Sequence, residues 1–392
     1  MVITQVLAGP TGLGTSAARL FRRAPGADVS SDTTENEPDR PAGSDAKRLS
    51  ISRFTFPWAS AMHPEADSIE LGARAFAERF GLVPHEAYRA RLARARYGRL
   101  AARCYPTADR ELVQILADYM IWYFPVDDLF VDRVHTLSPR TLLNLTAMID
   151  VLDHHRVGAE PVWGEYAWLD ICTRLRGRLS DEHFQRFAHG MRMWASTAGL
   201  QILNHLQDTS VDIPHYEAIR RHTSGMNPCL DVADAAELGP LTPAEFNQPA
   251  VQKLRMQANN VVCWSNDVQS VQIEMAQPGQ YWNMVSIYAS QGLTLQQAVD
   301  LVAARVNAEI TAFQLLARTV EPAASPQLRG FIDGMRHWMH GYQDWVDYDT
   351  QRYSDEFIAQ DADDTAVQLE TPTPVGQRSG GRESGTFWER SC

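Results

Sequence analysis

Apolar residues recur at intervals of three and four along the middle of the chain, and this spacing predicts helices. Glycine and proline residues, for example Pro214, Pro240 and Pro322, fall between the apolar segments and mark breaks. Clear two-residue alternation is hard to find, and no repeat has a fixed period of roughly 20–50 residues. The sequence therefore predicts an all-α protein, with helices over Glu65–Phe80, Pro84–Tyr97, Asp109–Tyr123, Ser138–Leu152, Asp181–Gln207, Ala250–Met275, Thr294–Val320 and Gln327–Tyr353.

The two ends of the 392-residue chain lack this helical pattern. Residues 1–50 mix glycine, proline, serine, threonine and charged residues with few large apolar side chains, and residues 359–392 are also rich in polar residues, proline and glycine. Such segments bury too little apolar surface to offset the entropy lost on ordering. We expect disordered extensions over residues 1–50 and 359–392, on either side of one helical domain at residues 51–358.

An apolar and aromatic run leads directly into three carboxylates, Asp127, Asp128 and Asp132. Helical residues four apart share one face and neighbours lie about 100° apart, so these side chains should gather beside Tyr123 and Phe124. Carboxylates this close repel one another unless a cation lies among them, and oxygen-only ligands favour Mg²⁺. The alternative is a solvated acidic helix end.

A second polar stripe follows the apolar residues that precede Asn266. Asn266, Ser270 and Glu274 are spaced four apart, which places an amide, a hydroxyl and a carboxylate along one helix face. Three oxygen ligands suit another Mg²⁺ ion. The alternative is an ordinary exposed helix face.

These two motifs, in this order, resemble those of the bacterial class I terpene synthases, or terpene cyclases. Arg220 stands where that family has its pyrophosphate-sensing arginine, and Arg352 with Tyr353 matches the family's Arg-Tyr pair. Trp338 also fits the pattern, and the resemblance covers roughly Phe54–Phe357.

The resemblance implies a single-domain helical bundle of the class I terpenoid synthase type around a central apolar cavity. It implies three Mg²⁺ ions held by Asp127, Asp128, Asp132, Asn266, Ser270 and Glu274. It further implies catalytic contacts from Arg220, Arg352 and Tyr353 to the leaving diphosphate. The family's helix break would fall at Ser224 and Gly225, and the substrate pocket would be lined by Tyr123, Phe124, Arg220, Ser224, Gly225, Trp338, Arg352 and Tyr353.

The reaction implied is cyclisation of a prenyl diphosphate, with farnesyl diphosphate as the first choice and a sesquiterpene as the product. Geranylgeranyl diphosphate and methylated geranyl diphosphate are alternative substrates. A chain-elongating prenyltransferase would normally carry two aspartate-rich motifs, whereas the second site here has Asn266 and Ser270. A non-catalytic helical binding protein is the third possibility, and intact ligands in both motifs argue against it.

The net charge of −12 argues against a nucleic-acid partner, which needs a basic face. Five scattered cysteines without metal-ligand spacing fit a reducing cytoplasm. No apolar run approaches the roughly 20 residues of a membrane span, and no signal peptide is evident. The family is often dimeric, so the resemblance also allows a homodimer.

Two residues depart from the family pattern. Ile273 stands where the family often has a basic residue, so one diphosphate contact would have to come from elsewhere. Pro125 lies just before the aspartates, where proline should kink the helix or remove a hydrogen bond, and this affects where Asp127 and Asp128 point.

Overall fold

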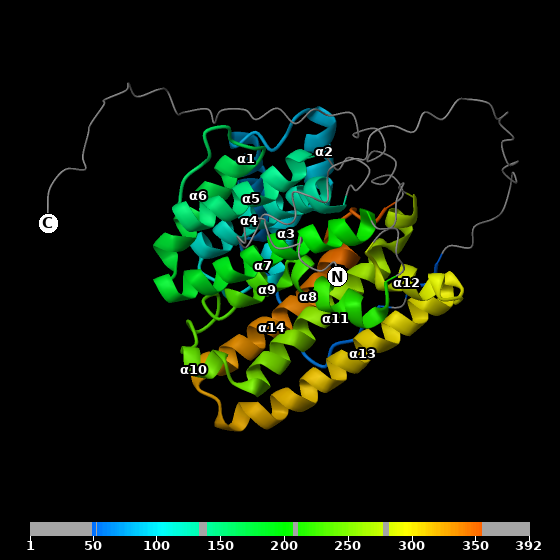
Figure 1. Cartoon of the computed structure of the whole chain (residues 1–392). Helices are drawn as coiled ribbons and strands as arrows, with labels where there is room; N and C mark the ends of the chain where they lie inside the picture. Colours follow the sequence, from blue (N-terminus) through cyan, green and yellow to red (C-terminus); the bar gives the residue numbers. More distant parts are fainter. Residues whose placement is uncertain (1–48, 52, 133–138, 207–210, 277–281, 355–392) are drawn as a thin grey trace, which may run out of the picture. The chain divides into compact units, whose positions relative to one another are not determined.

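A computed structural model describes residues 49–51, 53–132, 139–206, 211–276 and 282–354. Every regular element within these ranges is a helix (Figure 1), so the all-α prediction is confirmed. The α-helices are α1 (Ala66–Arg79), α2 (Glu86–Ala95), α3 (Tyr97–Cys104), α4 (Arg110–Asp127), α5 (Pro139–His154), α6 (Glu165–Arg178), α7 (Asp181–Leu206), α8 (Ile213–Thr223), α9 (Met226–Asp231), α10 (Pro243–Phe246), α11 (Pro249–Ala276), α12 (Met284–Ser290), α13 (Leu295–Val320) and α14 (Pro326–Asp344). A 3₁₀ turn covers Glu321–Ala323, and π-helices cover Asp128–Asp132 (η2) and Trp345–Asp349 (η5).

Helix α4 lies in the interior of this helical unit. Most of its residues are buried, which is expected for a helix that is apolar on nearly all sides. It packs on α1, α3 and α6, and Trp122 stacks on Trp168 of α6 with ring centroids 4.4 Å apart. Helix α11 packs on α13 and α14 and continues the same core. The two predicted ligand motifs therefore lie on helices that hold much of the core together.

Several helices begin at residues whose side chains cap the free backbone N–H groups. Asp109 accepts hydrogen bonds from the backbone N–H of Glu111 and Leu112 at the start of α4, each 3.1 Å long. Thr294 and Gln297 form a capping box at the start of α13. These local signals explain why the observed helix starts lie within a few residues of the predicted ones.

Two predicted helices are wrong in extent. The segment Pro84–Tyr97 is interrupted at Arg96, whose φ of 55° separates α2 from α3. The last helix was expected to reach Tyr353, but α14 ends at Asp344 and η5 ends at Asp349. The physical cause is tertiary: the Trp345 indole N–H donates to the carbonyls of Ala95 and Arg96, 3.1 and 3.0 Å away.

The aspartate-rich segment also departs from the expected α-helix. Helix α4 continues through Pro125 to Asp127, and the chain then forms the π-helix η2. Proline has no N–H to donate to the preceding turn, and a π-helix is a known irregularity at functional sites. Asp128 and Asp132 therefore do not share an α-helical face, and the side chain of Asp132 lies outside the described residues.

The predicted extensions lie almost entirely outside the described residues, as do Ser138 and Gln207. Within the described part, Leu49 packs against the core, and Ser50 exchanges two backbone hydrogen bonds of 2.9 Å with the side chain of Gln296 on α13. The described helical unit thus includes contacts from the last two residues of the predicted N-terminal extension.

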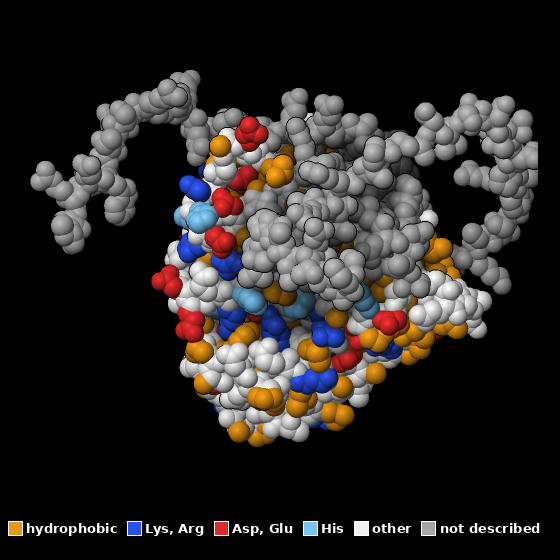
Figure 2. Space-filling view, viewed as in Figure 1, with side chains coloured by type: hydrophobic (Ala, Val, Ile, Leu, Met, Phe, Trp, Pro, Cys, Tyr) orange, Lys and Arg blue, Asp and Glu red, His pale blue; other side chains and the backbone are white. Residues whose placement is uncertain are grey.

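Apolar side chains on the described part of one face are scattered among polar ones (Figure 2). Among the residues that the structure describes, no helix has both the length and the hydropathy required to cross a bilayer.

Candidate active site

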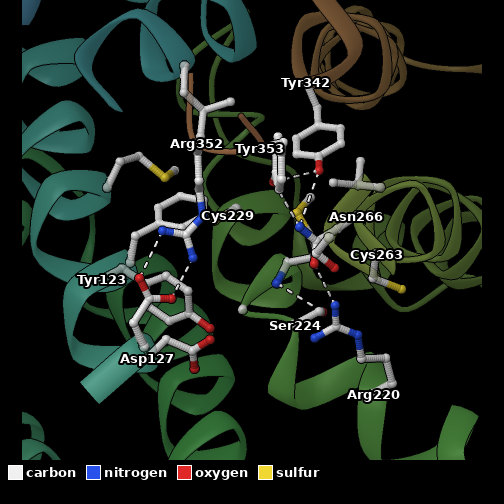
Figure 3. Close-up of a pocket in the computed structure, with 18 of the residues that line it drawn as sticks. Tyr123, Asp127, Arg220, Ser224, Cys229, Cys263, Asn266, Tyr342, Arg352 and Tyr353 are labelled. Carbon is white, nitrogen blue, oxygen red and sulfur yellow. Dashed lines mark hydrogen bonds and ion pairs between the residues drawn. The ribbon is translucent and has the colours of Figure 1, made fainter. Parts of the chain in front are cut away.

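One cavity brings together nearly all of the predicted site residues (Figure 3). Its wall includes Tyr123, Phe124, Asp127, Asp128, Arg220, Ser224, Gly225, Asn266, Ser270, Glu274, Trp338, Arg352 and Tyr353. Its empty volume is about 1260 Å³, open solvent at the mouth included. Residues of both motifs therefore line the same cavity, while the roles of these residues stay predictions.

On the α4 side of the cavity, both described aspartates are held by side chains from distant elements. The Trp194 indole N–H of α7 donates to Asp127 Oδ1 over 2.9 Å. Arg352 forms an ion pair with Asp128, with 2.8 Å between Nη1 and Oδ2, and also donates to the Tyr97 hydroxyl over 2.9 Å. Burial alone would lower the pKa of Arg352, but the charge and hydrogen bonds of Asp128 together with the nearby Tyr97 and Tyr353 outweigh it, and the pKa lies well above the usual value. Arg352 therefore stays charged and anchors the Asp128 end of the wall.

On the α11 side, Arg220 is held by two neighbouring residues of the second motif. It donates to Asn266 Oδ1 over 2.8 Å and to Asp267 Oδ1 over 2.8 and 3.1 Å. Asp267 is fully buried and also accepts from the Tyr216 hydroxyl and from the Met284 backbone N–H, the latter over 3.0 Å. Burial raises the pKa of Asp267, whereas Arg220 opposes the rise. Asp267 thus fixes the direction of the Arg220 guanidinium.

Of the two adjacent arginines, Arg220 lines the cavity and Arg221 does not. This agrees with the resemblance, in which Arg220 stands at the family's pyrophosphate-sensing position. Sequence reasoning did not assign a role to Asp267, although its position between the ligand candidates Asn266 and Ser270 was visible.

The amide of Asn266 joins the two ends of the cavity. Its Nδ2 donates to the hydroxyls of Tyr353 and Tyr342, over 2.9 and 3.3 Å, and these hydroxyls lie 3.1 Å apart. Because Nδ2 is used in this way, Oδ1 points toward Arg220 (Figure 3). Tyr342 was not predicted as a site residue, since nothing in the sequence distinguishes it from other buried tyrosines.

Asn283 holds the far end of the second motif. Its Nδ2 donates to Glu274 Oε2 over 2.9 Å and lies 3.5 Å from Ser270 Oγ, while it also donates to the Asp267 carbonyl over 2.8 Å. Asn283 caps α12 at the same time. One fully buried amide therefore positions two candidate ligands.

The predicted helix break between α8 and α9 is present at Ser224 and Gly225. Gly225 has a φ of 68°, and a Cβ atom there would lie 2.2 Å from the Tyr123 hydroxyl. The same hydroxyl donates to the Thr223 carbonyl over 3.3 Å. Glycine is required here both by the backbone conformation and by the close approach of Tyr123.

Apart from Arg91, the rest of the cavity wall is mostly apolar and aromatic. Phe124 stacks on Tyr97 with ring centroids 4.6 Å apart and planes inclined by 15°. Wall residues that the sequence did not single out for the site are Arg91, Leu100, Met120, Met226, Cys229, Val262, Cys263, Trp282 and Tyr342. They come from seven different segments, so no local motif could have identified them.

The donor atoms on the wall fit a hard cation such as Mg²⁺. They are oxygens from the carboxylates Asp127, Asp128 and Glu274, the amide of Asn266 and the hydroxyl of Ser270. Within the described residues, no three His, Cys, Asp or Glu side chains cluster as a metal site.

Comparison with known proteins agrees with this geometry. Residues 118–312 match the family described as terpene synthase family 2, C-terminal metal binding. A (+)-corvol ether B/(+)-corvol ether A synthase that cyclises (2E,6E)-farnesyl diphosphate, from Kitasatospora setae, is 71% identical over 81% of this chain and 99% of its own. A sesquiterpene synthase from Metarhizium brunneum is 55% identical over 84% of this chain and 96% of its own.

A solved structure with a similar fold is 2-methylisoborneol synthase from Streptomyces coelicolor, in complex with Mg²⁺ and 2-fluoroneryl diphosphate. Its TM-score is 0.70 at 18% identity, over 78% of this chain and 97% of that one, so the likeness concerns the fold alone. The family match and the close relatives go further, and they show that this chain belongs to terpene synthase family 2 and is a terpene synthase.

Proposed function

We propose that the chain is a Mg²⁺-dependent cyclase that converts farnesyl diphosphate into a sesquiterpene and releases diphosphate. The observation that carries this proposal is the convergence of both polar motifs on one cavity that also has an aromatic and aliphatic wall. The relatives from Kitasatospora and Metarhizium, named for farnesyl diphosphate cyclisation and for sesquiterpene synthesis, support the choice of substrate.

The residues that would hold Mg²⁺ are Asp127, Asp128, Asn266, Ser270 and Glu274, and we keep three ions as the proposed number. Asp132 stays a proposed ligand from the sequence alone. When bound, Mg²⁺ supplies positive charge that offsets the charge of the diphosphate.

The polar residues of the wall would favour breakage of the carbon–oxygen bond of the substrate. Both electrons of that bond leave with the diphosphate and an allylic carbocation remains. Arg220, oriented by Asp267, can donate two hydrogen bonds to phosphate oxygens where negative charge grows. Arg352 and Tyr353 lie on the same wall and would contact the same group.

The apolar residues would protect and fold the carbocation. Aromatic faces such as those of Phe124 and Trp338 can stabilise a cation by about 0.5–2 kcal/mol each. A wall of this kind also excludes water, which would end the reaction early. The reaction finishes when the cation loses a proton or takes up one water molecule with loss of a proton.

An oxygenated product is favoured by one specific observation. The relative that is 71% identical is named for the ethers that it makes, and an ether skeleton needs one oxygen atom beyond the hydrocarbon. We propose a sesquiterpene ether as the first product class, with the oxygen taken from water. Water forms one C–O bond to the cation and loses a proton; a double bond of the resulting alcohol then takes up a proton, and the hydroxyl oxygen forms the second C–O bond to the new cation with loss of its own proton.

The test is to incubate the full chain and Mg²⁺ with geranyl, 2-methylgeranyl, farnesyl and geranylgeranyl diphosphates and to analyse the extracts by gas chromatography and mass spectrometry. We expect a C15 product from farnesyl diphosphate, carrying ¹⁸O when H₂¹⁸O is used. Turnover of a different diphosphate, without turnover of farnesyl diphosphate, would change the substrate assignment. Longer diphosphates among the products would indicate chain elongation, and the absence of any product would contradict catalysis.

We also propose that the catalytic unit spans residues 51–358 and acts in the cytoplasm. The four described cysteines, Cys104, Cys172, Cys229 and Cys263, are free and buried, which suits a reducing compartment. A homodimer stays a hypothesis to be tested by light scattering of the full chain.

A further inference from the structure

Two predicted site residues lie beyond the last helix of the described chain. Helix α14 ends at Asp344, η5 spans Trp345–Asp349, and Arg352 and Tyr353 follow in a turn. Both residues line the cavity (Figure 3). Because no regular helix carries them, the backbone that presents their side chains depends on contacts from other segments.

The last residue of η5, Asp349, is bound by two arginines of α3. Asp349 is buried, with 7% of its surface exposed. Its Oδ1 accepts a hydrogen bond from Arg99 Nη1 over 3.1 Å, and its Oδ2 accepts one from Arg103 Nε. Arg103 also donates from Nη1 to Asp344 Oδ2 over 3.1 Å. One guanidinium group therefore joins the residue before η5 to the last residue of η5.

Two further contacts hold the residues that follow η5. The Gln351 backbone N–H donates to the Arg94 carbonyl of α2 over 3.0 Å. Arg352 Nη1 donates to the Tyr97 hydroxyl of α3 over 2.9 Å. The short stretch from Asp349 to Arg352 is therefore fixed at three points by α2 and α3.

Stability alone does not explain why charged residues occupy this contact. Asp349, Arg99 and Arg103 are not among the residues that line the described cavity, so they do not bind a ligand there themselves. The desolvation of a buried ion pair offsets much of its attraction, and apolar residues of similar volume often stabilise a fold as well. Charge-assisted hydrogen bonds, however, are directional and fix Asp349 in one place. A shift of about 1 Å in a binding group can cost roughly 100-fold in rate, and Arg352 lies only three residues further along the chain.

We propose that Asp349, bound by Arg99 and Arg103, positions Arg352 for its contact with the diphosphate group of the substrate. Asp349 touches no substrate and acts only through the backbone that leads to Arg352. This inference rests on the proposed function, since it assumes that Arg352 binds diphosphate. It gives the contact between α3 and η5 a role in substrate binding.

The experiment is a double-mutant cycle on the full chain, with Asp349→Asn, Arg352→Ala and the double variant. Calorimetry measures the binding of inorganic diphosphate in the presence of Mg²⁺. Asp349→Asn should weaken this binding about 10-fold, since the loss of outer contacts to the ligands of metal sites costs about 10–100-fold. In the Arg352→Ala background the same change should have no further effect, because the group that Asp349 positions is absent.

The matched control is Asp67→Asn. Asp67 pairs with the same Arg99, but its side chain is 84% exposed, and exposed pairs contribute little. Diphosphate binding should therefore stay at the wild-type level in this control. If Asp349→Asn does not fold, as judged by circular dichroism, Arg103→Lys takes its place in the cycle. Lysine keeps the charge but lacks the planar group that binds Asp344 and Asp349 together.

Three outcomes overturn the proposal. Equal weakening in the wild-type and Arg352→Ala backgrounds shows a general structural role for Asp349. Wild-type affinity in Asp349→Asn shows that the ion pairs do not affect diphosphate binding. Undiminished affinity in Arg352→Ala shows that there is no contact to position. The proposed function fails by a separate result, the absence of a C15 product from farnesyl diphosphate, because the cycle measures binding without turnover.

Discussion

The two walls of the cavity present candidate ligands by different means. On α11, Asn266, Ser270 and Glu274 follow regular helical spacing, and Asp267 and Asn283 from nearby in the chain hold the polar groups in place. On the α4 wall the backbone leaves α-helical geometry after Asp127. On α11, regular helical spacing alone places the three candidate ligands on one face, and other residues then fix their side chains. On the α4 wall the irregular backbone provides no such alignment, so the positions of Asp127 and Asp128 depend on contacts with distant segments.

Those distant contacts come from three elements on the α4 side. Trp194 of α7 reaches Asp127, and Arg352 from the segment after η5 reaches Asp128, with Tyr97 of α3 beside it. We therefore expect substitutions on the α4 wall to disturb contacts with α7 and with the segment after η5.

The largest effect is expected from Asp128→Asn. The change removes a candidate ligand charge and weakens the ion pair to Arg352. Turnover of farnesyl diphosphate should fall about 10²–10³-fold, in line with the loss of one electrostatic contact in a preorganised site. Steady-state kinetics measures the effect, and Asp153→Asn, which breaks an exposed ion pair to Arg192, serves as the control. Wild-type rates in Asp128→Asn would exclude this carboxylate from the site.

The second largest effect is expected from substitutions on the α11 wall. Ser270→Ala combined with Glu274→Gln removes two of the three candidate ligands of the regular stripe. The Mg²⁺ concentration for half-maximal rate should rise by about 10-fold or more, since outer contacts to metal sites alone cost 10–100-fold. Gln272→Ala on the exposed face of α11 is the control. An unchanged Mg²⁺ dependence would mean that the stripe binds no metal.

A moderate effect is expected from Asp267→Asn, which leaves the candidate ligands in place. Arg220 would lose its charged partner and its fixed direction, so kcat/KM should fall about 10–100-fold, the range of one charge-assisted hydrogen bond. The free energy of unfolding should also fall, on the order of 1–3 kcal/mol, because a buried cation loses its counter-charge. Kinetics and urea unfolding test both parts. If the variant were less stable but kept the wild-type kcat/KM, Asp267 would stabilise the fold without orienting Arg220 for catalysis.

The smallest effect on activity is expected at Asp118, a buried carboxylate of α4 away from the cavity wall. Burial raises its pKa to about 6, although Arg174 and Gln114 act against the rise. The folded protein then binds a proton that the unfolded chain has released between about pH 4 and 6, so this group makes stability fall as pH rises through that window.

This pH dependence changes the free energy of unfolding of the wild type by on the order of 2 kcal/mol between about pH 4 and 6, and it should be absent in Asp118→Asn. Urea unfolding at pH 4 and pH 6.5 measures the difference from the wild type. A pH dependence equal to that of the wild type would show that Arg174, 2.8 Å away, keeps Asp118 ionised throughout.

Prediction from sequence succeeded where periodicity and local chemistry act together. The apolar spacing gave the helix class, and side chains such as Asp109 and Thr294 marked helix starts because capping is a local interaction. It failed at Arg96 and at the end of α14, since the Trp345 contact to the α2–α3 junction joins residues about 250 positions apart.

The sequence was enough to predict a helical protein and two oxygen-rich motifs that follow apolar runs. Both predictions use only the spacing of residues along a single helix. The family resemblance added Arg220 as a predicted diphosphate contact and Gly225 as part of a predicted helix break. The packing of the helices was needed to find that Asp267 and Asn283 contact polar residues of the second motif. It was also needed to find that Trp194 and Arg352 contact the first motif and that Arg91 lines the cavity. The physical reason is that each of these contacts depends on how helices pack, and side-chain packing between distant segments leaves no periodic trace in the sequence.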